Sequence, residues 1–451
     1  MRSWPFRGLF VAIFALSVAA PTAAAHETGH QRSYRHPTPM IFVHGGAGSG
    51  GQFESQALRF TSNGYPKRFV NVLEYDSTFS VNTREQVLAN LDALIAKVKS
   101  STGRDKVDVL GHSLGTTLMH EYLATPTRAG NVRKYVNIDG RTAATPPGGV
   151  STLAIWAGRG TPGREITGAE NVTIPNQTHV QVATSAESFR PMYRFLTGHR
   201  PRRDISPERW ITLSGRAQLF PQNTGVGDRT LEVWEVSGRT GHRRWNRPVA
   251  RVNIADDGSW GPVRGIRAGA HYEFALLREG ENTHHLYFEP FVRSSHLVRL
   301  LTSEPDGGVN LLIERSPAHS AFTIVRYKEL WGDQGAQTDQ LFVNGTNVIN
   351  AATAPITKRV IGMFAFDAGS DRVSNVTAPL PVVFSLPFLS GVDLFVPATA
   401  SAGGTSSVAL RSRGDGPLRI VNVPDFPSST NSITVNFNDY DPVDPRPHWR
   451  P

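Results

Sequence analysis

Cysteine is absent from the 451-residue chain. Disulfide bonds therefore cannot stabilise it, and its stability has to come from packing. A thiol nucleophile is excluded as well, which removes the whole class of cysteine hydrolases. Lysine is scarce, with 7 of the 47 basic residues, so arginine carries nearly all of the positive charge.

The formal net charge is +9, but the arginines are spread along the chain and form no basic cluster. Nucleic-acid-binding proteins concentrate such charge on one face or stripe, so nucleic acid is not an expected partner. A weak attraction to an anionic lipid or cell-wall surface stays open. Nothing in the sequence indicates an oligomeric state.

Long apolar runs are missing beyond the first 25 residues, and no later segment is long and apolar enough to cross a bilayer. The N-terminus has a basic start at Arg2 and Arg7, an apolar stretch over residues 9–20 and three alanines at 23–25. This order predicts a cleaved secretory signal peptide over residues 1–25, and hence a secreted, extracellular protein. An uncleaved anchor is the alternative, which the small residues at its end disfavour.

The hydrophobic patterning changes at a linker around Pro201. Residues 34–199 alternate short apolar runs with segments of helical periodicity, which predicts a mostly parallel sheet with helices on both faces. Beyond the linker, runs of β-branched and aromatic residues are separated by turn signals, a pattern typical of all-β sandwiches or barrels. We divide this part into a β-sandwich domain at 205–302 and a second β-rich domain at 303–441.

The strongest local signal is Gly-His-Ser-Leu-Gly at residues 111–115, which follows an apolar run and precedes a helix-forming stretch. A Gly-x-Ser-x-Gly in this context is typical of a nucleophile elbow, where a sharp turn exposes the serine hydroxyl at the end of a sheet. The glycines are small because strand and helix pass close together there. The motif predicts Ser113 as a nucleophile in an α/β hydrolase fold, and an ordinary Gly-rich turn is the alternative.

A second glycine-rich segment follows the predicted strand at residues 40–43 and begins His44-Gly45-Gly46. In α/β hydrolases this position supplies half of the oxyanion hole, because backbone N–H groups must reach a developing alkoxide without an intervening side chain. The amides of Gly46 and Leu114 are assigned to this role. A phosphate-binding loop is not indicated, because the Gly-Lys-Ser/Thr ending and the dinucleotide-binding glycine pattern are missing.

A serine nucleophile needs a base and an acid, which follow it in this fold in the order Asp or Glu and then His. His120 belongs to the predicted elbow helix and points away from the serine, and His199 follows the last predicted helix of the domain. His179 lies in a loop after the predicted strand at 172–174, which is the position that a base requires. His179 is therefore the predicted base, with a surface histidine as the alternative.

The predicted acid is chosen from four carboxylates between Ser113 and His179, namely Glu121, Asp139, Glu165 and Glu170. Asp139 ends its own predicted strand, and a short carboxylate on a rigid strand end holds an imidazole better than a glutamate on a mobile loop. Glu165, on a Gly-Pro-rich loop after the next strand, is the second candidate. The predicted triad is Ser113, Asp139 and His179, and it needs no metal ion and no organic cofactor.

Six stretches are more specific than generic hydrolase signatures, at residues 44–56, 111–116, 138–140, 178–181, 324–329 and 342–345. Together they resemble a family of bacterial and archaeal lipases and carboxylesterases, which are α/β hydrolases with a C-terminal, β-rich lipid-binding domain. The resemblance spans nearly the whole mature chain. It implies a secreted serine carboxylic-ester hydrolase, an ester or lipid substrate, and the same triad of Ser113, Asp139 and His179.

The chain departs from this family at one place. Relatives carry a helical lid insertion after the strand equivalent to residues 70–75, whereas here only residues 76–83 separate that strand from the next predicted helix. An open acyl pocket is therefore expected, which favours shorter or bulkier acyl groups. A polyester or amide hydrolase with the same triad stays open, as does a non-catalytic surface-, lipid- or glycan-binding protein.

Aromatic side chains are frequent in the predicted β-region. Such residues in strands mostly pack inward, so they are expected in its core rather than on a ligand surface. The aromatics considered are Trp234, Trp245, Trp260 and Tyr272.

Overall fold

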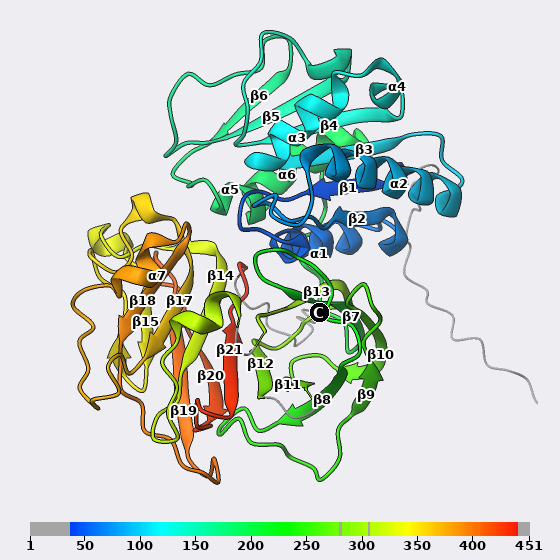
Figure 1. Ribbon diagram of the computed structural model, residues 1–451. Helices are drawn as coiled ribbons and strands as arrows, with labels where there is room; N and C mark the ends of the chain where they lie inside the picture. Colours follow the sequence, from blue (N-terminus) through cyan, green and yellow to red (C-terminus); the bar gives the residue numbers. More distant parts are fainter. Residues whose placement is uncertain (1–36, 279–281, 305–306, 441–451) are drawn as a thin grey trace, which may run out of the picture. The chain divides into compact units, whose positions relative to one another are not determined.

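The computed structural model describes residues 37–278, 282–304 and 307–440 (Figure 1). The predicted signal peptide, residues 1–25, lies outside the described residues. None of the described helices is both long enough and apolar enough to span a lipid bilayer.

The first part of the chain is built on a six-stranded sheet with the strand order β2-β1-β3-β4-β5-β6, in which all neighbours run parallel. The predicted α/β hydrolase architecture is therefore confirmed for this part. The strands are β1 (Met40–Val43), β2 (Val70–Leu73), β3 (Val107–His112), β4 (Val132–Ile138), β5 (Ser151–Ala157) and β6 (Glu170–Ile174). The helices are α1 (Glu54–Ser62), α2 (Arg84–Thr102), α3 (Leu114–Leu123), α4 (Pro126–Ala129), α5 (Gln181–Thr184) and α6 (Ala186–Thr197).

Helices cover both faces of this sheet, as parallel strands with crossover connections require (Figure 1). Helices α1 and α6 share one apolar core with the sheet, whereas α2 and α3 share another. In α2, Val87, Leu91 and Ile95 recur at helical spacing and are buried. Thr83 forms a capping box at its start, and Gly103 ends it in the left-handed conformation.

The described residues beyond the linker form three sheets. Strands β10-β7-β13 make the first, strands β18-β17-β14-β21-β12-β11-β8-β9 the second, and strands β16-β15-β19-β20 the third. Their bounds are β7 (Trp210–Leu219), β8 (Thr230–Val236), β9 (Ala250–Asn253), β10 (Ser259–Arg267), β11 (His271–Leu277), β12 (Thr283–Phe288), β13 (Ser295–Thr302), β14 (Phe322–Leu330), β15 (Gln340–Val343), β16 (Thr346–Asn347), β17 (Val360–Phe366), β18 (Leu389–Asp393), β19 (Thr405–Arg411), β20 (Leu418–Pro424) and β21 (Asn431–Asn436). A short helix, α7 (Pro381–Ser385), precedes β18. The prediction of an all-β C-terminal region is confirmed.

The eight-stranded sheet joins strands from both predicted β domains. Strands β8, β9, β11 and β12 come before residue 303, whereas β14, β17, β18 and β21 come after it. The last of these, β21, pairs in parallel with β12 on one side and with β14 on the other. The two segments therefore share one sheet, and their division into separate domains stays a prediction.

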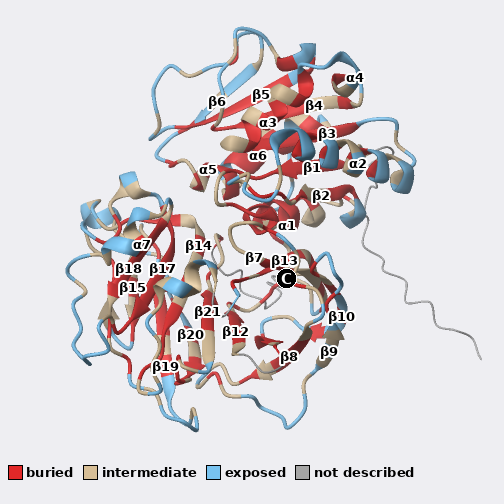
Figure 2. Cartoon of the chain, viewed as in Figure 1, coloured by how far each residue is buried: buried red, intermediate tan, exposed pale blue. Residues whose placement is uncertain are grey.

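The two largest apolar cores of the described β region lie between its strands, whose buried parts are red in Figure 2. Trp234, Trp260 and Tyr272 are buried in them, as the sequence predicts. Trp245 is 58% exposed, so the expectation of a core position is wrong for this residue. It lies in the connection between β8 and β9, where the strand alternation that predicts burial no longer applies.

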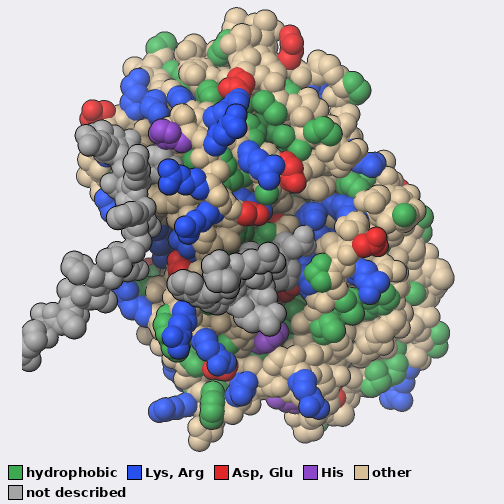
Figure 3. All heavy atoms as spheres, turned by 180° about the vertical axis from the view of Figure 1, so that it is seen from behind, with side chains coloured by type: hydrophobic (Ala, Val, Ile, Leu, Met, Phe, Trp, Pro, Cys, Tyr) green, Lys and Arg blue, Asp and Glu red, His purple; other side chains and the backbone are tan. Residues whose placement is uncertain are grey.

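The space-filling view shows Lys and Arg side chains dispersed among polar and apolar ones on the face in view (Figure 3). Acidic side chains lie between several of them. The dispersed basic side chains on this face agree with the even spread of arginines along the sequence.

Buried polar contacts connect the α/β part to the β region. Glu74, which follows β2, accepts hydrogen bonds from Arg299 Nε at 2.7 Å and from Gln218 Nε2 at 3.2 Å. The side-chain amide of Asn223 donates to the carbonyls of Gly48 and Tyr75 at 2.7 and 3.0 Å. Buried polar groups that lose such partners are costly, so these contacts tie the two parts to one geometry.

Candidate active site

Ser113 lies between β3 and α3 in a strained backbone conformation, with φ 52° and ψ −119°. The flanking glycines permit it. A Cβ at Gly111 would lie 2.9 Å from the carbonyl oxygen of Gly115, and a Cβ at Gly115 would lie 2.3 Å from the carbonyl oxygen of Val43. Strand, sharp turn and helix are thus arranged as the motif predicts.

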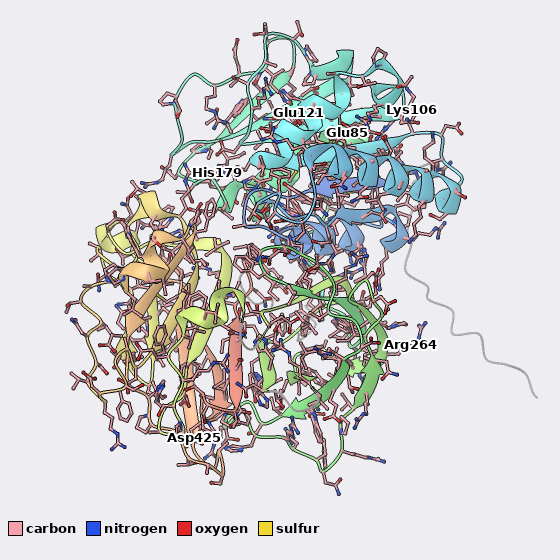
Figure 4. The ribbon with its side chains drawn as sticks, in the orientation of Figure 1. Glu85, Lys106, Glu121, His179, Arg264 and Asp425 are labelled. Carbon is pink, nitrogen blue, oxygen red and sulfur yellow. The ribbon has the colours of Figure 1, made fainter. Side chains whose placement is uncertain are left out.

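The three residues predicted as a triad are hydrogen-bonded in a row. His179 Nε2 lies 2.9 Å from Ser113 Oγ, and His179 Nδ1 lies 2.6 Å from Asp139 Oδ2. The histidine comes from the loop between β6 and α5, and the aspartate directly follows β4. In Figure 4, His179 lies at the side of the α/β part that contacts the β region. This row can transfer a proton from the serine to the imidazole while the carboxylate orients the ring.

Asp139 is held by more than the histidine. Its Oδ1 accepts hydrogen bonds from the Ala157 amide at 3.0 Å and from Arg164 Nη1 at 2.8 Å. Burial alone would raise the pKa of Asp139, but the hydrogen bonds from His179 and Ala157 and the charge of Arg164 outweigh it and lower the pKa below its usual value. The carboxylate is therefore kept ionised, as an orienting acid requires.

Glu165, His120 and His199, the other candidates for the acid and the base, lie outside the hydrogen-bonded row of Ser113, His179 and Asp139. Glu165 is exposed and accepts a hydrogen bond from the Thr167 hydroxyl at 3.0 Å. His120 sits in α3 against the ring of Tyr135, and burial lowers its pKa to about 4. His199 is exposed beyond the end of α6.

His112, which the sequence analysis did not single out, is a further part of the site. Its Nε2–H donates to the backbone carbonyl of His179 at 2.9 Å, and its Nδ1 accepts from Gln52 Nε2 at 3.0 Å. Burial, with a further contribution from the neighbouring His179, lowers the pKa of His112 to about 3. It is therefore neutral and anchors the loop that carries His179. The sequence shows that His112 belongs to the Gly-x-Ser-x-Gly motif, but it does not show the contact of His112 with His179, which lies 67 residues further along the chain.

The glycine-rich segment reaches the same pocket. Gly46 lines a space of about 270 Å³ together with Ser113, His179 and Tyr327, and a Cβ at Gly46 would meet no atom within 4 Å. Leu114 is the first residue of α3, where an amide has no partner within the helix. Both positions are compatible with oxyanion binding, and the assignment of their amides to this role stays a prediction.

Two buried residues hold this segment in place. His44 donates from Nδ1 to the Gly45 carbonyl at 2.9 Å, and its Nε2 accepts from Asn223 at 3.3 Å. Glu74 accepts from the Gly50 amide at 3.1 Å while it pairs with Arg299. The glycine-rich segment is thus fixed partly by Asn223 and Arg299 of the β region.

Replacing Glu74 with Gln is expected to destabilise the fold by about 3 kcal/mol at neutral pH. Burial alone would raise the pKa of Glu74, but the charge of Arg299 and the hydrogen bonds from Arg299 and Gln218 lower it to about 2. A carboxyl group whose pKa is lower in the folded than in the unfolded state stabilises the fold at pH values above its unfolded-state pKa. This contribution is lost as the pH falls through the folded-state pKa.

Denaturant unfolding between pH 2 and 7 measures this effect. The stability gap between the wild type and Glu74→Gln should shrink as the pH falls from about 4 to about 2. Glu85→Gln is the control, because the Glu85 side chain is 76% exposed and its pairing with Arg128 is solvent-screened. A gap that stays constant with pH would contradict the assigned role of Glu74.

A larger apolar cavity, with about 830 Å³ of space that includes open solvent, lies next to the pocket around Ser113. Tyr327 and Ile361 line both spaces, and Ala47 of the glycine-rich segment lines the larger one. Its other walls come from the β region, including the side chains of Val325 and Phe364.

Solved structures with a similar fold cover only part of this chain. They include a predicted CIB-like hydrolase from Thermoplasma acidophilum (15% identity, TM-score 0.28, 37% of this chain and 89% of the other). Another is tomato methylketone synthase I with 2-tridecanone (10% identity, TM-score 0.30, 37% of this chain and 100% of the other). A third comes from a study of the metagenome-derived lipolytic enzymes LipS and LipT (14% identity, TM-score 0.29, 37% of this chain and 96% of the other). All three TM-scores lie below 0.5, so these likenesses add nothing to an assignment of function. A search of curated proteins found no match.

Family models match three segments of the chain. Residues 37–133 match the model for class 2 lipases, and residues 209–305 match the lipase C-terminal domain. A third model, described as a C-terminal domain, matches residues 308–441. The chain belongs to a lipase/esterase family with a C-terminal β domain.

Proposed function

We propose that the protein is a secreted serine carboxylic-ester hydrolase. The observation that carries the proposal is the hydrogen-bonded row Ser113–His179–Asp139 at a nucleophile elbow. Membership of a lipase/esterase family supports hydrolysis as the reaction type. The N-terminal sequence over residues 1–25 is the basis for secretion.

In the first half of the reaction, His179 Nε2 takes the Ser113 proton while Oγ attacks the ester carbonyl carbon. The amides of Gly46 and Leu114 bind the resulting oxyanion, and Asp139 stabilises the imidazolium. Collapse of the tetrahedral intermediate breaks the ester C–O bond, and His179 returns the proton to the leaving alcohol. Water, activated by the same imidazole, then hydrolyses the acyl-enzyme and releases the acid.

The substrate class follows from the apolar cavity beside the pocket. Tyr327 and Ile361 line both spaces, and we propose that an acyl chain attached to Ser113 Oγ passes these two residues into the space lined by the β region. Burial of each methylene contributes about 0.8 kcal/mol, so such a cavity favours chains long enough to enter it. We therefore propose medium- to long-chain acyl esters as substrates, in place of the shorter or bulkier groups expected from the missing lid insertion.

Filling the cavity tests this substrate class. Val325→Trp is expected to lower kcat/KM for p-nitrophenyl palmitate by about tenfold or more, equivalent to at least 1.4 kcal/mol, and to leave p-nitrophenyl acetate nearly unchanged. The reason is that Val325 lines the cavity but not the pocket around Ser113. Hydrolysis rates over a series from acetate to palmitate provide the measurement.

Ile420→Trp is the matched control, because Ile420 lies on β20 and is 44% exposed. It should leave the chain-length profile unchanged. Equal losses for acetate and palmitate in Val325→Trp would show that the cavity does not hold the acyl chain. Cleavage of anilides at rates comparable to esters would instead favour an amide hydrolase with the same triad.

A further inference from the structure

One peptide group, which joins His179 to Val180, is held on both sides. Its carbonyl accepts a hydrogen bond from His112 Nε2 at 2.9 Å, and its N–H donates to Glu329 Oε1 at 2.7 Å. The C=O and N–H of a trans peptide point in opposite directions, so the two partners lie on opposite sides of the backbone. This peptide directly follows the Cα of His179, and its orientation therefore limits where the imidazole can point.

Glu329 reaches this loop from β14 of the β region. The residue is fully buried, and its φ of 59° lies in the left-handed region, where a non-glycine residue costs about 1–2 kcal/mol. The pairing of β14 with β17 shifts register between Val325 and Leu330, as at a β-bulge. Bulges redirect side chains out of the regular alternation, and here the redirected carboxylate meets the Val180 amide.

Arg413 reinforces the same contact. From the turn between β19 and β20, its guanidinium donates to the backbone carbonyl of Glu329 at 3.1 Å and to Gln181 Oε1 at 2.8 Å. It also pairs with Asp339 at 2.6 Å and lies 3.5 Å from the centre of the Trp331 ring. One buried arginine therefore fixes both the backbone of Glu329 and the first residue of α5.

We propose that Glu329 is a positioning residue for the proposed catalytic base. Through the Val180 amide it holds His179 within reach of Ser113, so that the β region completes the active site of the α/β part. The inference rests on the proposed role of His179. Glu329 acts through Val180, and it is not among the described residues that line the pocket around Ser113.

The contact requires an acceptor oxygen rather than a charge. Burial raises the pKa of Glu329, whereas the nearby Thr178 hydroxyl, the Val180 amide and the charge of Arg413 act against this increase. In either protonation state one oxygen remains to accept the Val180 N–H. An amide side chain of the same length keeps that acceptor, but an aliphatic one does not.

Three variants test the proposal. Glu329→Leu is expected to lower kcat about 10- to 100-fold with little change in KM, because the substrate still binds while the base is misplaced. Glu329→Gln should recover most of that loss. Glu273→Gln is the matched control: Glu273 is a buried carboxylate of the same region, and it pairs with Arg243 in the connection between β8 and β9 and with His285 on β12.

Two further readouts do not depend on ester turnover. Hydrogen exchange in the peptide spanning residues 177–184 should quicken in Glu329→Leu and stay slow in Glu329→Gln and in the control. The low-field proton resonance of the short His179–Asp139 hydrogen bond should weaken in Glu329→Leu alone. If Glu329→Leu does not fold, Glu329→Asp replaces it. The aspartate side chain is shorter by one methylene, so its acceptor oxygen lies further from the Val180 amide.

Wild-type kcat together with wild-type exchange in folded Glu329→Leu or Glu329→Asp would overturn the proposal. Failure of the proposed function is a separate result. In that case Ser113→Ala would keep its turnover while the exchange difference at residues 177–184 persisted.

Discussion

Replacing Ser113 with Ala is expected to lower kcat for ester hydrolysis by about 10⁴- to 10⁶-fold. The variant removes the only atom that can form the acyl-enzyme in the proposed mechanism, while the pocket and the cavity beside it keep their shape. The residual rate then comes from binding and from the oxyanion site alone. Rates with a p-nitrophenyl ester that the wild type cleaves well provide the measurement.

Ser101→Ala serves as the control, because Ser101 is an exposed residue near the end of α2, ahead of the first residue of β3, whereas Ser113 follows the last residue of that strand. Both variants should bind lipid vesicles as the wild type does, since the substitutions leave the β region intact. Full ester turnover by Ser113→Ala would exclude Ser113 as the nucleophile. If the wild type cleaves no ester, a non-catalytic binding protein becomes the better interpretation.

Replacing Asp139 with Asn is expected to lower kcat about 10⁴-fold. An amide that accepts through Oδ1 from the Ala157 amide and Arg164 presents its NH₂ group to His179 Nδ1. The imidazole then carries its proton on Nε2, where it cannot accept the proton of the serine. Steady-state kinetics and the loss of the low-field proton signal measure the effect.

The second candidate acid provides the comparison for this variant. Glu165→Gln should keep activity close to the wild type, since Glu165 is exposed and its carboxylate contacts Thr167. The opposite pattern, with Asn tolerated at position 139 and Gln not tolerated at position 165, would move the role of the acid to Glu165.

The α/β part was predictable because its signals are local. The run 107–110 and the glycines at 111 and 115 predict a strand, a turn and a helix, and the structure has β3, Ser113 and α3 there. His179 and Asp139 could be chosen from their places after strands, because the carboxyl ends of parallel strands meet at one edge of a sheet. Their contact with each other then follows from the fold.

The remaining parts of the site depend on contacts between distant residues. Glu329 lies 149 residues beyond Val180, and Arg413 lies 232 residues beyond Gln181. A bulge in β14 turns Glu329 inward, and nothing in the alternation of residues 321–327 predicts that bulge. The apolar cavity was hidden for the same reason, because its walls come from strands whose pairing is not encoded locally.

Strand order was the least predictable feature of the β region. Hairpins such as β19–β20 follow from turn signals, and the turn between these two strands contains Arg413, Gly414 and Asp415. The parallel pairs β12–β21 and β14–β21 join segments about 110 to 150 residues apart, and no turn chemistry specifies them. Long-range pairing of this kind is selected by packing of the whole region.

The position of β21 determines when the β region can be completed during synthesis. The strand lies inside the eight-stranded sheet, yet it is the last strand of the described chain to leave the ribosome. Until residue 436 has been made, β12 and β14 each have an unpaired edge, and such edges invite wrong partners. A nascent chain therefore cannot close the eight-stranded sheet before residue 436 has been made, so this sheet is completed only after β21 has left the ribosome.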